Sequence, residues 1–258
     1  MLQPAVLRVG IDPTIELGPL TLAWHGITIA VGILVGALVA ARFARERGLD
    51  PEPLTTFAVL ASLAGIAGAR LLYLLESGEI ADPAAWLGSR GFTFSGGLVL
   101  AALVIAAYVR GRSLSAVYLD AAAVGLALGL AIGRIGDVIN GEHYGPQSDF
   151  LLAVRNTHPE ALVPSPAVAY HSGGLYEVLL GAAIFALVWP LRHRLRRPTA
   201  LAWIVLGLYG IGRFLESFLR LDSPELALGL TTAHASSLAL LLAAGAGFLW
   251  ARRRFSAR

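Results

Sequence analysis

The sequence contains no cysteine and no lysine, and few of its 258 residues are charged. Without cysteine, the chain has no disulfide, no thiolate metal ligand and no cysteine nucleophile of its own. Without lysine, it cannot form the Schiff base by which seven-helix retinal proteins hold their chromophore. Because 56% of the residues are apolar and only 14% are charged, the composition is that of a membrane protein.

Seven apolar windows are long enough to cross a bilayer, which takes about 20 helical residues. They cover residues 21–43, 56–75, 92–109, 117–139, 174–190, 200–219 and 233–250. We expect an all-α integral membrane protein with one transmembrane domain over residues 1–258. Residues 1–20 are expected to form an interfacial arm, and residues 140–172 a long connection on the same face. No basic n-region precedes the first window, so we expect no cleavable signal peptide.

The arginines predict the orientation of these helices. Thirteen of the 20 flank the windows on one side, and only Arg8, Arg90, Arg155 and Arg220 lie on the other. The positive-inside rule therefore predicts an outer N-terminus and a cytoplasmic C-terminus. Because these flanks account for the basic charge, we expect no nucleic-acid partner.

Three arginines lie inside predicted helices, toward the outer face: Arg70, Arg134 and Arg213. Each costs roughly 2.5–3.5 kcal/mol on insertion scales, so a partner or water must compensate it. His25 and Asp137 fall at the same level. Since guanidinium groups match phosphate with a bidentate fork, we predict a pocket for an anionic head group of the outer leaflet.

The spacing of these residues predicts some of their contacts. Arg134 and Asp137 are three residues apart, share a helix face and are expected to pair. Gly136 favours close approach of a neighbouring backbone, whereas Gly125 and Gly129 indicate plain helix packing. One polar stripe in the sixth helix must face protein or water; its members are Tyr209, Arg213, Glu216 and Arg220.

The long outer connection contains three histidines, His143, His158 and His171. Their spacing is not that of metal ligands, and we interpret them as surface residues, with only a looser candidacy as a proton-accepting base. The sequence thus predicts no metal site.

The stretch "GRIGDVINGEHYG", residues 133–145, resembles the GRIGNFINGExxG signature of the prolipoprotein diacylglyceryl transferases. Weaker likenesses follow along the chain in the family's order. The stretch "IDPTIELGPLTLAWHG" is similar to the family's N-terminal arm and first-helix entry, and "GARLLY" to its second helix. Three further stretches are similar to family motifs: "FSGGL" to HGGL, "HSGGLYE" to HPSQLYE, and "YGIGRFLESFLR" to YGxxRFxxExxR. The chain is similar to this family along almost its whole length.

The resemblance implies a bacterial plasma-membrane enzyme without a cofactor, whose active site faces the outer leaflet. Such an enzyme transfers a diacylglyceryl group from phosphatidylglycerol to the lipobox cysteine thiol of a preprolipoprotein. Its partners are these two substrates and the surrounding membrane lipids. The implied phospholipid-binding residues are Arg70, Ser95, Gly96, Gly97, Arg134, Asn140, Gly145 and Arg213, with Glu142 and Tyr209 polarising the head-group pocket.

The sequence departs from the family pattern at four positions. Ser95 replaces the histidine before GGL, His25 a tyrosine, and Asp137 an asparagine. The family glutamate of the sixth helix falls at Ser217, while Glu216 stands one residue earlier, which is a rotation of roughly 100° on a helix. Because a serine hydroxyl does not deprotonate a thiol unaided, we expect His25 or Asp137 to supply the base.

Two alternatives remain open. The loss of the histidine at Ser95 favours a related protein with the same lipid pocket but another acceptor, or with no turnover. A small-solute transporter is a third possibility, although transporter sites usually lie at the bilayer midplane.

Overall fold

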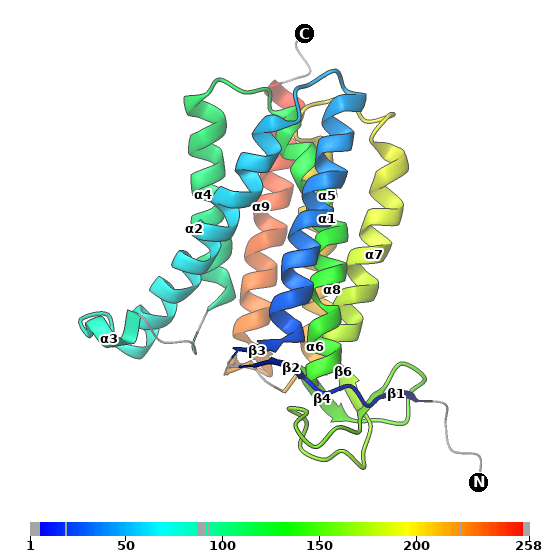
Figure 1. Cartoon of the computed structure of the whole chain (residues 1–258). Helices are drawn as coiled ribbons and strands as arrows, with labels where there is room; N and C mark the ends of the chain where they lie inside the picture. Colours follow the sequence, from blue (N-terminus) through cyan, green and yellow to red (C-terminus); the bar gives the residue numbers. More distant parts are fainter. Residues whose placement is uncertain (1–5, 19, 87–90, 92, 222, 255–258) are drawn as a thin grey trace.

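Seven long helices run side by side in the computed structural model, which describes residues 6–18, 20–86, 91, 93–221 and 223–254 (Figure 1). The side chains of Leu20, Phe94 and Ser95 lie outside this description. The long helices are α1 (Trp24–Glu46), α2 (Glu52–Ser77), α4 (Phe94–Gly111), α5 (Val117–Gly133), α7 (Gly173–Leu191), α8 (Ala200–Glu216) and α9 (Thr232–Arg254). Shorter elements are α3 (Pro83–Trp86), α6 (Ile135–Asn140), which continues α5, and the 3-10 helix η1 (Ser217–Leu219) after α8.

Six helical segments of the described chain are long and apolar enough to cross a membrane. They are α1, α2, α5 with α6, α7, α8 with η1, and α9. In α4 the described apolar stretch, Gly96–Gly111, is shorter. The chain is therefore a mostly helical, multi-pass membrane protein, and six of the seven predicted spans are confirmed.

The two ends of the bundle differ in chemistry. The arginine-bearing connections, residues 47–51, 112–116 and 192–199, lie at the end where α9 finishes; we call this the arginine end (Figure 1). Strands cover the opposite end, the sheet end. The buried apolar core includes Phe43, Leu54, Tyr118 and Leu201, at helix termini of the arginine end.

Helices α1 and α5 approach each other through glycines. A Cβ atom on Gly129 would lie 2.6 Å from the Gly32 carbonyl oxygen, and one on Gly36 would lie 2.9 Å from that of Gly125. No side chain fits between the two backbones at these points. The prediction that Gly125 and Gly129 serve helix packing is confirmed.

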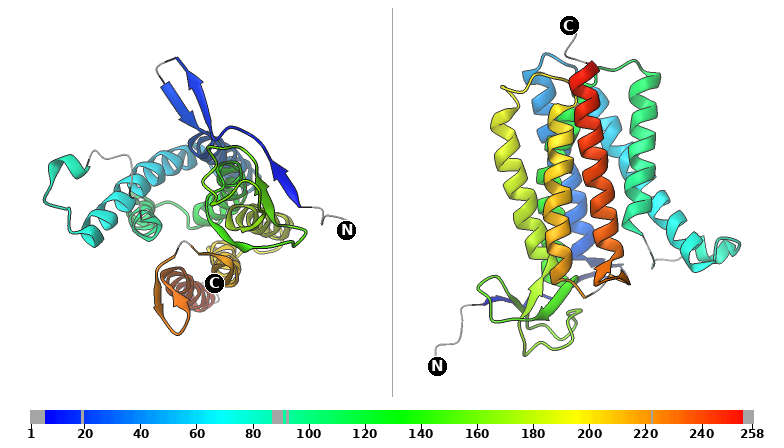
Figure 2. Two further views of the ribbon diagram at one scale, coloured as in Figure 1. Left: turned by 90° about the horizontal axis from the view of Figure 1, so that it is seen from below. Right: turned by 180° about the vertical axis from the view of Figure 1, so that it is seen from behind.

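Helices α2 and α4 pack together at one flank of the bundle (Figures 1 and 2). A Cβ atom on Gly96 would lie 2.5 Å from the Leu72 Cβ atom, and one on Gly97 would lie 2.7 Å from the Gly65 carbonyl oxygen. The "GGL" glycines therefore have a packing role against α2.

A four-stranded sheet caps the sheet end. It joins β1 (Leu7–Val9), β5 (Val154–Asn156), β6 (Tyr170–Ser172) and β4 (Tyr144–Gln147), in that order. Two hairpins project beside it: β2 (Thr14–Leu17) with β3 (Leu20–Ala23), and β7 (Glu225–Ala227) with β8 (Leu230–Thr231) (Figure 2).

The sheet refines the expectation of an irregular arm and connection. Strand β1 pairs in parallel with β5, so the N-terminal arm and the long connection form one structure. The prolines do not prevent this, because such short strands tolerate proline at edges and bulges. Pro146, for example, lies in edge strand β4, where the register with β6 shifts.

Candidate active site

The junction of α5, α6 and the start of α1 positions the signature residues. Gly136 lies so close to α1 that an added Cβ atom would come within 2.5 Å of the His25 Cα atom. The Thr28 hydroxyl secures the contact: it accepts from the Gly136 amide (3.1 Å) and donates to the Gly133 carbonyl (2.8 Å). The predicted close approach at Gly136 is confirmed, and it places His25 beside Asp137.

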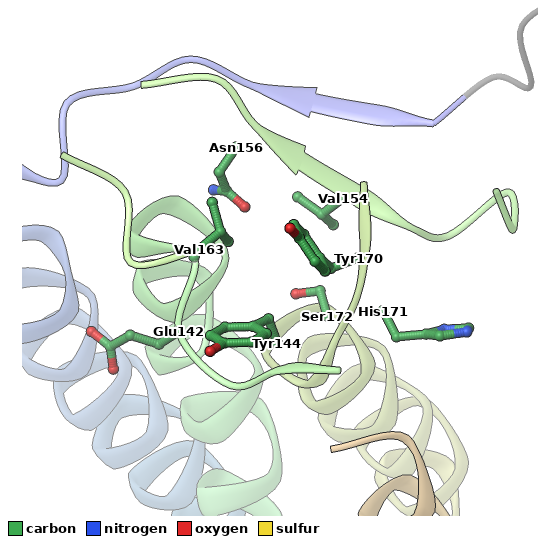
Figure 3. A pocket seen from close by; sticks show the side chains of 9 residues that line it. Glu142, Tyr144, Val154, Asn156, Val163, Tyr170, His171 and Ser172 are labelled. Carbon is green, nitrogen blue, oxygen red and sulfur yellow. The ribbon is translucent and has the colours of Figure 1, made fainter. Parts of the chain in front are cut away.

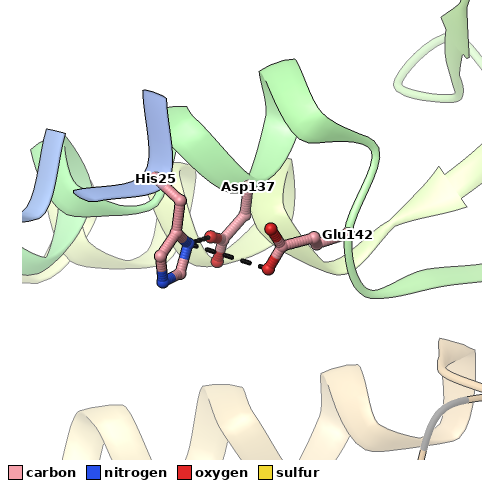
Figure 4. Close-up of side chains that lie close together, drawn as sticks. All are labelled: His25, Asp137 and Glu142. Atoms are coloured by element: carbon pink, nitrogen blue, oxygen red, sulfur yellow. Dashed lines mark hydrogen bonds and ion pairs between the residues drawn. The ribbon is translucent and has the colours of Figure 1, made fainter. Parts of the chain in front are cut away.

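Asp137 is fully buried and is held on both oxygens. His25 Nδ1 hydrogen-bonds to Oδ1, and Arg134 Nη1 donates to Oδ2 at 2.5 Å. The predicted pairing of Arg134 with Asp137 is confirmed. Because 37% of the His25 side chain is exposed, its ring is open to a substrate while its Nδ1 atom is fixed (Figure 4).

Glu142 and Asn140 extend this group. Asn140 Nδ2 donates to Glu142 Oε1 at 2.8 Å, and Glu142 Oε2 lies 3.7 Å from His25 Nδ1. Gly141, with φ of 74°, ends α6 in the left-handed conformation that glycine adopts readily and turns the chain toward Glu142. The Oδ1 atom of Asn140 is buried without a hydrogen-bond partner in the described part of the chain.

A second cluster joins α5, α7 and α8 around Glu177. This carboxylate is almost fully buried and pairs with Arg134 Nε, with Arg213 Nη1 at 2.9 Å and with Arg220 Nη1 at 3.8 Å. Glu216 also pairs with Arg213 (2.7 Å) and Arg220 (3.5 Å). Three arginines thus gather where two helices and a helix junction meet.

The structure assigns Glu216 and Arg220 to this cluster. Glu216 reaches the arginines despite its one-residue offset from the family position. Its neighbour Ser217 instead donates to the Arg213 carbonyl (2.7 Å) at the turn into η1. Arg220, expected on an outer flank, is buried because its guanidinium faces Glu177 and Glu216.

Tyr209 lies one turn before Arg213 on α8. Its hydroxyl is buried and, among the described residues, has no hydrogen-bond partner. It interacts electrostatically with Glu177, Arg134 and Arg213. The hydroxyl is therefore available as a donor at the arginine cluster.

Three predicted site residues, Arg70, Gly96 and Gly97, have other surroundings. The Arg70 guanidinium donates to the carbonyls of Gly91 (2.9 Å) and Ala85, in the connection after α2. Gly96 and Gly97 contact α2, as described above. Ser95 lies in α4, but its side chain is outside the described residues.

Gly145 has a structural reason to be glycine. An added Cβ atom would lie 2.9 Å from the Leu219 carbonyl carbon and 3.1 Å from the His171 Cβ atom. Strand β4 therefore packs directly against the backbone of η1, which fixes the segment before Arg220.

Sequence reasoning missed Glu177 and His143. Glu177 ends the "HSGGLYE" stretch, and its signal was a carboxylate within an otherwise apolar window. The interpretation of His143 as a surface residue is wrong: Nδ1 accepts from Arg220 Nη2 at 2.7 Å, and Nε2 lies 3.7 Å from Asp137 Oδ2. Only the folded loop brings it there.

An apolar groove of about 330 Å³ runs between α7 and α8 beside the arginine cluster. Its lining residues are Phe150, His171, Tyr176, Leu180, Gly212, Leu215, Glu216 and Leu219. Glu216 belongs to both the groove and the cluster. A ligand with an anionic group at the arginines therefore has an apolar path beside it.

A smaller hollow lies beneath the sheet (Figure 3). It is lined by Gly141, Glu142, Tyr144, Val154, Asn156, Val163, Tyr170, His171 and Ser172. Glu142 and His171 point out of it in opposite directions. The sheet thus supports one residue that faces His25 and another that lines the groove.

His25, Asp137 and Glu142 lie close enough for each to offer an atom to a metal ion. However, His25 Nδ1 is already bonded to Asp137 Oδ1, and Arg134 holds the other oxygen. This arrangement suits proton transfer, because a buried carboxylate orients an exposed imidazole.

Similarity to known proteins places the chain in one family. The family model of prolipoprotein diacylglyceryl transferase matches residues 13–250. A phosphatidylglycerol–prolipoprotein diacylglyceryl transferase of Geobacillus kaustophilus is 35% identical, covering 93% of this chain and 91% of the relative. Proteins of the same description are 34% identical in Gloeobacter violaceus (93% and 92% covered) and 32% identical in Thermosynechococcus vestitus (81% of each). A chain matched over nearly all of its length, with arginines and a histidine–aspartate pair gathered at its signature motif, belongs to the prolipoprotein diacylglyceryl transferase family.

Proposed function

We propose that this protein transfers a diacylglyceryl group from phosphatidylglycerol to the cysteine thiol of a preprolipoprotein lipobox. Its relatives are named for this reaction. The observation that carries the proposal is the position of the His25–Asp137 pair next to Arg134, which also belongs to the arginine cluster. Arg134 therefore contacts both the proposed base pair and the proposed phosphate-binding cluster.

The pair supplies the base. If Asp137 accepts the Nδ1 proton of His25, the neutral ring presents its Nε2 lone pair to the substrate. A thiol with a pKa of about 8.5 then loses its proton to Nε2. Ser95 is not needed for this step, so the departure from the family histidine leaves the reaction possible.

The reaction forms one bond and breaks one. The thiolate sulfur attacks the glyceryl carbon that carries the phosphate, and a C–S bond forms. The C–O bond breaks, and its electron pair leaves with glycerol phosphate. The proton taken by His25 passes to the departing phosphate or to water, which restores the neutral base.

The arginines stabilise the leaving phosphate. Arg134 and Arg213 side chains are 16% and 14% exposed, against 5% for Arg220, so the first two are the accessible donors. In the structure Arg134 pairs with Asp137 and Glu177, and Arg213 pairs with Glu177 and Glu216; a phosphodiester adds a further anionic partner. Hydrogen-bond donors that already point toward the place where negative charge develops can stabilise that charge without first having to reorient.

We propose that the groove between α7 and α8 receives hydrocarbon of the donor lipid. It is apolar and begins at Glu216, beside the arginines that hold the head group. Ser95, Asn140, Glu142, Gly145 and Tyr209 remain proposed residues of the surrounding pocket. Arg70 instead donates to the carbonyls of Gly91 and Ala85, and Gly96 and Gly97 pack against α2.

We further propose that α4 is a seventh span. The N-terminus then lies outside, the arginine end faces the cytoplasm, and the sheet end lies at the outer leaflet of a bacterial plasma membrane. The arginine distribution supports this orientation. A preprolipoprotein emerging across the membrane meets the active site on that side.

The test uses purified protein in micelles containing phosphatidylglycerol and a lipobox peptide, with mass spectrometry of the peptide. We expect a diacylglyceryl adduct on the cysteine with wild-type protein, loss of the adduct with Arg134→Ala, and normal adduct formation with Arg112→Ala at the arginine end. Failure of wild-type protein to form the adduct, while it still binds phosphatidylglycerol, would instead support a relative with another acceptor.

A further inference from the structure

His143 occupies an unusual backbone position within the candidate site. Its φ is 58°, in the left-handed region that non-glycine residues rarely adopt. Such a conformation costs about 1–3 kcal/mol and persists where the surrounding structure enforces it. Here the His143 carbonyl accepts a hydrogen bond from the Gly173 amide at the start of α7 (2.9 Å). The loop is thus tied to α7, with the imidazole turned toward the charged cluster.

The contacts of the ring define its tautomer. Arg220 Nη2 lies 2.7 Å from Nδ1, and a guanidinium group can only donate. Nδ1 is therefore the acceptor, and the neutral ring carries its proton on Nε2. That atom lies 3.7 Å from Asp137 Oδ2, and a small movement of the ring would bring the two into hydrogen-bond distance.

His143 differs from His25 in what it offers a substrate. Both of its ring nitrogens face protein groups, Arg220 on one side and Asp137 on the other. His25 uses one nitrogen on Asp137 and has an exposed ring. His143 is consequently not a base for the thiol, yet it contacts the carboxylate that orients the base.

We propose that His143 is a positioning residue, a neutral imidazole that separates Arg220 from Asp137 and thereby sets how strongly Asp137 supports His25. The inference rests on the proposed function, because it assigns His25 as the base. With the imidazole in place, the positive charge of Arg220 is shared by Glu177 and Glu216 and does not neutralise Asp137 directly.

The charged groups around this unit come from several elements. Arg220 follows η1 and faces His143, Glu177 of α7 and Glu216 of α8. Asp137 of α6 faces His143, His25 of α1 and Arg134. Glu142 Oε2 lies 3.7 Å from His25 Nδ1, and Arg134 is a further charged group that acts on His25. In the reaction the thiol proton moves to His25, while His143 gains and loses none.

The first test compares His143→Leu with His143→Gln in the adduct assay. Leucine removes both polar contacts, whereas the glutamine amide can accept from Arg220 and donate to Asp137. We expect His143→Leu to lower kcat about tenfold, as is typical when a supporting partner is lost, with KM for phosphatidylglycerol within about twofold. We expect the acidic limb of the kcat/KM profile to move by about half a pH unit, and His143→Gln to restore both.

His158→Leu is the matched control, because His158 lies in the same connection but faces Asp12 at 3.9 Å. It should behave as wild type. A His143→Leu enzyme with an unmoved pH limb and unchanged kcat, or a loss that His143→Gln does not restore, would overturn the proposal.

The second test needs no activity. In wild-type protein labelled with 15N-histidine, the resonances that disappear in His143→Gln belong to His143. Near neutral pH they should report a neutral ring protonated at Nε2. A charged ring, or a proton on Nδ1, would overturn the inference. Because this measurement uses no substrate, it separates failure of the His143 inference from failure of the proposed transferase activity.

Discussion

At the scale of single residues, the proposed chemistry depends on the contrast between His25 and Asp137. The carboxylate is fully buried and the imidazole is partly exposed, which supports the proposal that Asp137 orients the ring and His25 reacts. We expect His25→Gln to slow adduct formation about 10²–10⁴-fold, the usual contribution of a general base. Phosphatidylglycerol binding should persist, because the arginines are unchanged.

The rate is measured by mass spectrometry of the peptide, and lipid binding by a vesicle co-flotation assay. His158→Gln serves as the control histidine. A His25→Gln protein with the wild-type rate would remove His25 as the base.

Glu177 has a different role, since it balances three arginines in a buried place. Removing one partner of a buried ion pair typically costs about 3–5 kcal/mol. We expect Glu177→Gln to lower the Tm, and added phosphatidylglycerol to raise the Tm of the variant more than that of wild type, because the lipid phosphate replaces the missing charge.

Thermal unfolding in detergent, with and without the lipid, measures both effects. Glu46→Gln is the matched control, because Glu46 pairs with Arg192 at 2.7 Å at the arginine end. Equal rescue of both variants by the lipid would show that phosphate does not bind at the Glu177 cluster.

Two kinds of residue could be predicted from the sequence. Some have partners nearby in the chain, and others carry a charge whose insertion into a membrane costs much free energy. Arg134 and Asp137 share a helix face, and the three intramembrane arginines needed partners. Glu177 and His143 were missed because their partners come from distant elements. Arg70 donates to the carbonyls of Gly91 and of Ala85 in α3, which no spacing rule reveals.

At the scale of elements, the contact of α1 with α5 depends on the absence of side chains. We expect Gly125→Ala to lower the Tm, because its Cβ atom would lie 3.0 Å from that of Ala40 and closer still to the α1 backbone. Overpacking of this kind costs about 1–3 kcal/mol. Gly245→Ala on α9 should be neutral or stabilising, since an added Cβ atom there meets nothing within 4 Å.

Thermal unfolding of both variants in the same detergent checks this. An equal response of the two glycines would contradict the packing role.

The helices could be predicted because apolar windows of sufficient length are unambiguous. The strands could not be predicted, because β1, β5 and β6 have only three residues each and become strands by pairing with segments far away in the sequence. The pairing of β1 with β5 joins segments whose sequences show no common pattern.

At the scale of the whole molecule, one labelling experiment tests both the number of membrane spans and the orientation of the chain. Because the chain has no cysteine, single cysteines report topology without background. With seven spans and an outer N-terminus, a membrane-impermeant maleimide added to intact cells should label Glu16→Cys and Glu160→Cys. Ser113→Cys and Arg253→Cys should be labelled only after permeabilisation.

These four positions are exposed in the structure. If α4 did not cross the membrane, Ser113→Cys would be labelled together with Glu16→Cys in intact cells, and the proposed topology would be wrong.

The parallel pairing of β1 with β5 also determines an order of events during synthesis. Leu7 lies opposite Val154, and α1 packs most closely on α5. At a translation rate of about 5–20 residues per second, the partner strand leaves the ribosome roughly 7–30 s after the first. During that interval the glycine face of α1 lacks the α5 backbone that packs on it, and β1 lacks its partner strand. A nascent chain stopped before α5 therefore exposes an unsatisfied surface, on which quality-control proteases of the membrane can act.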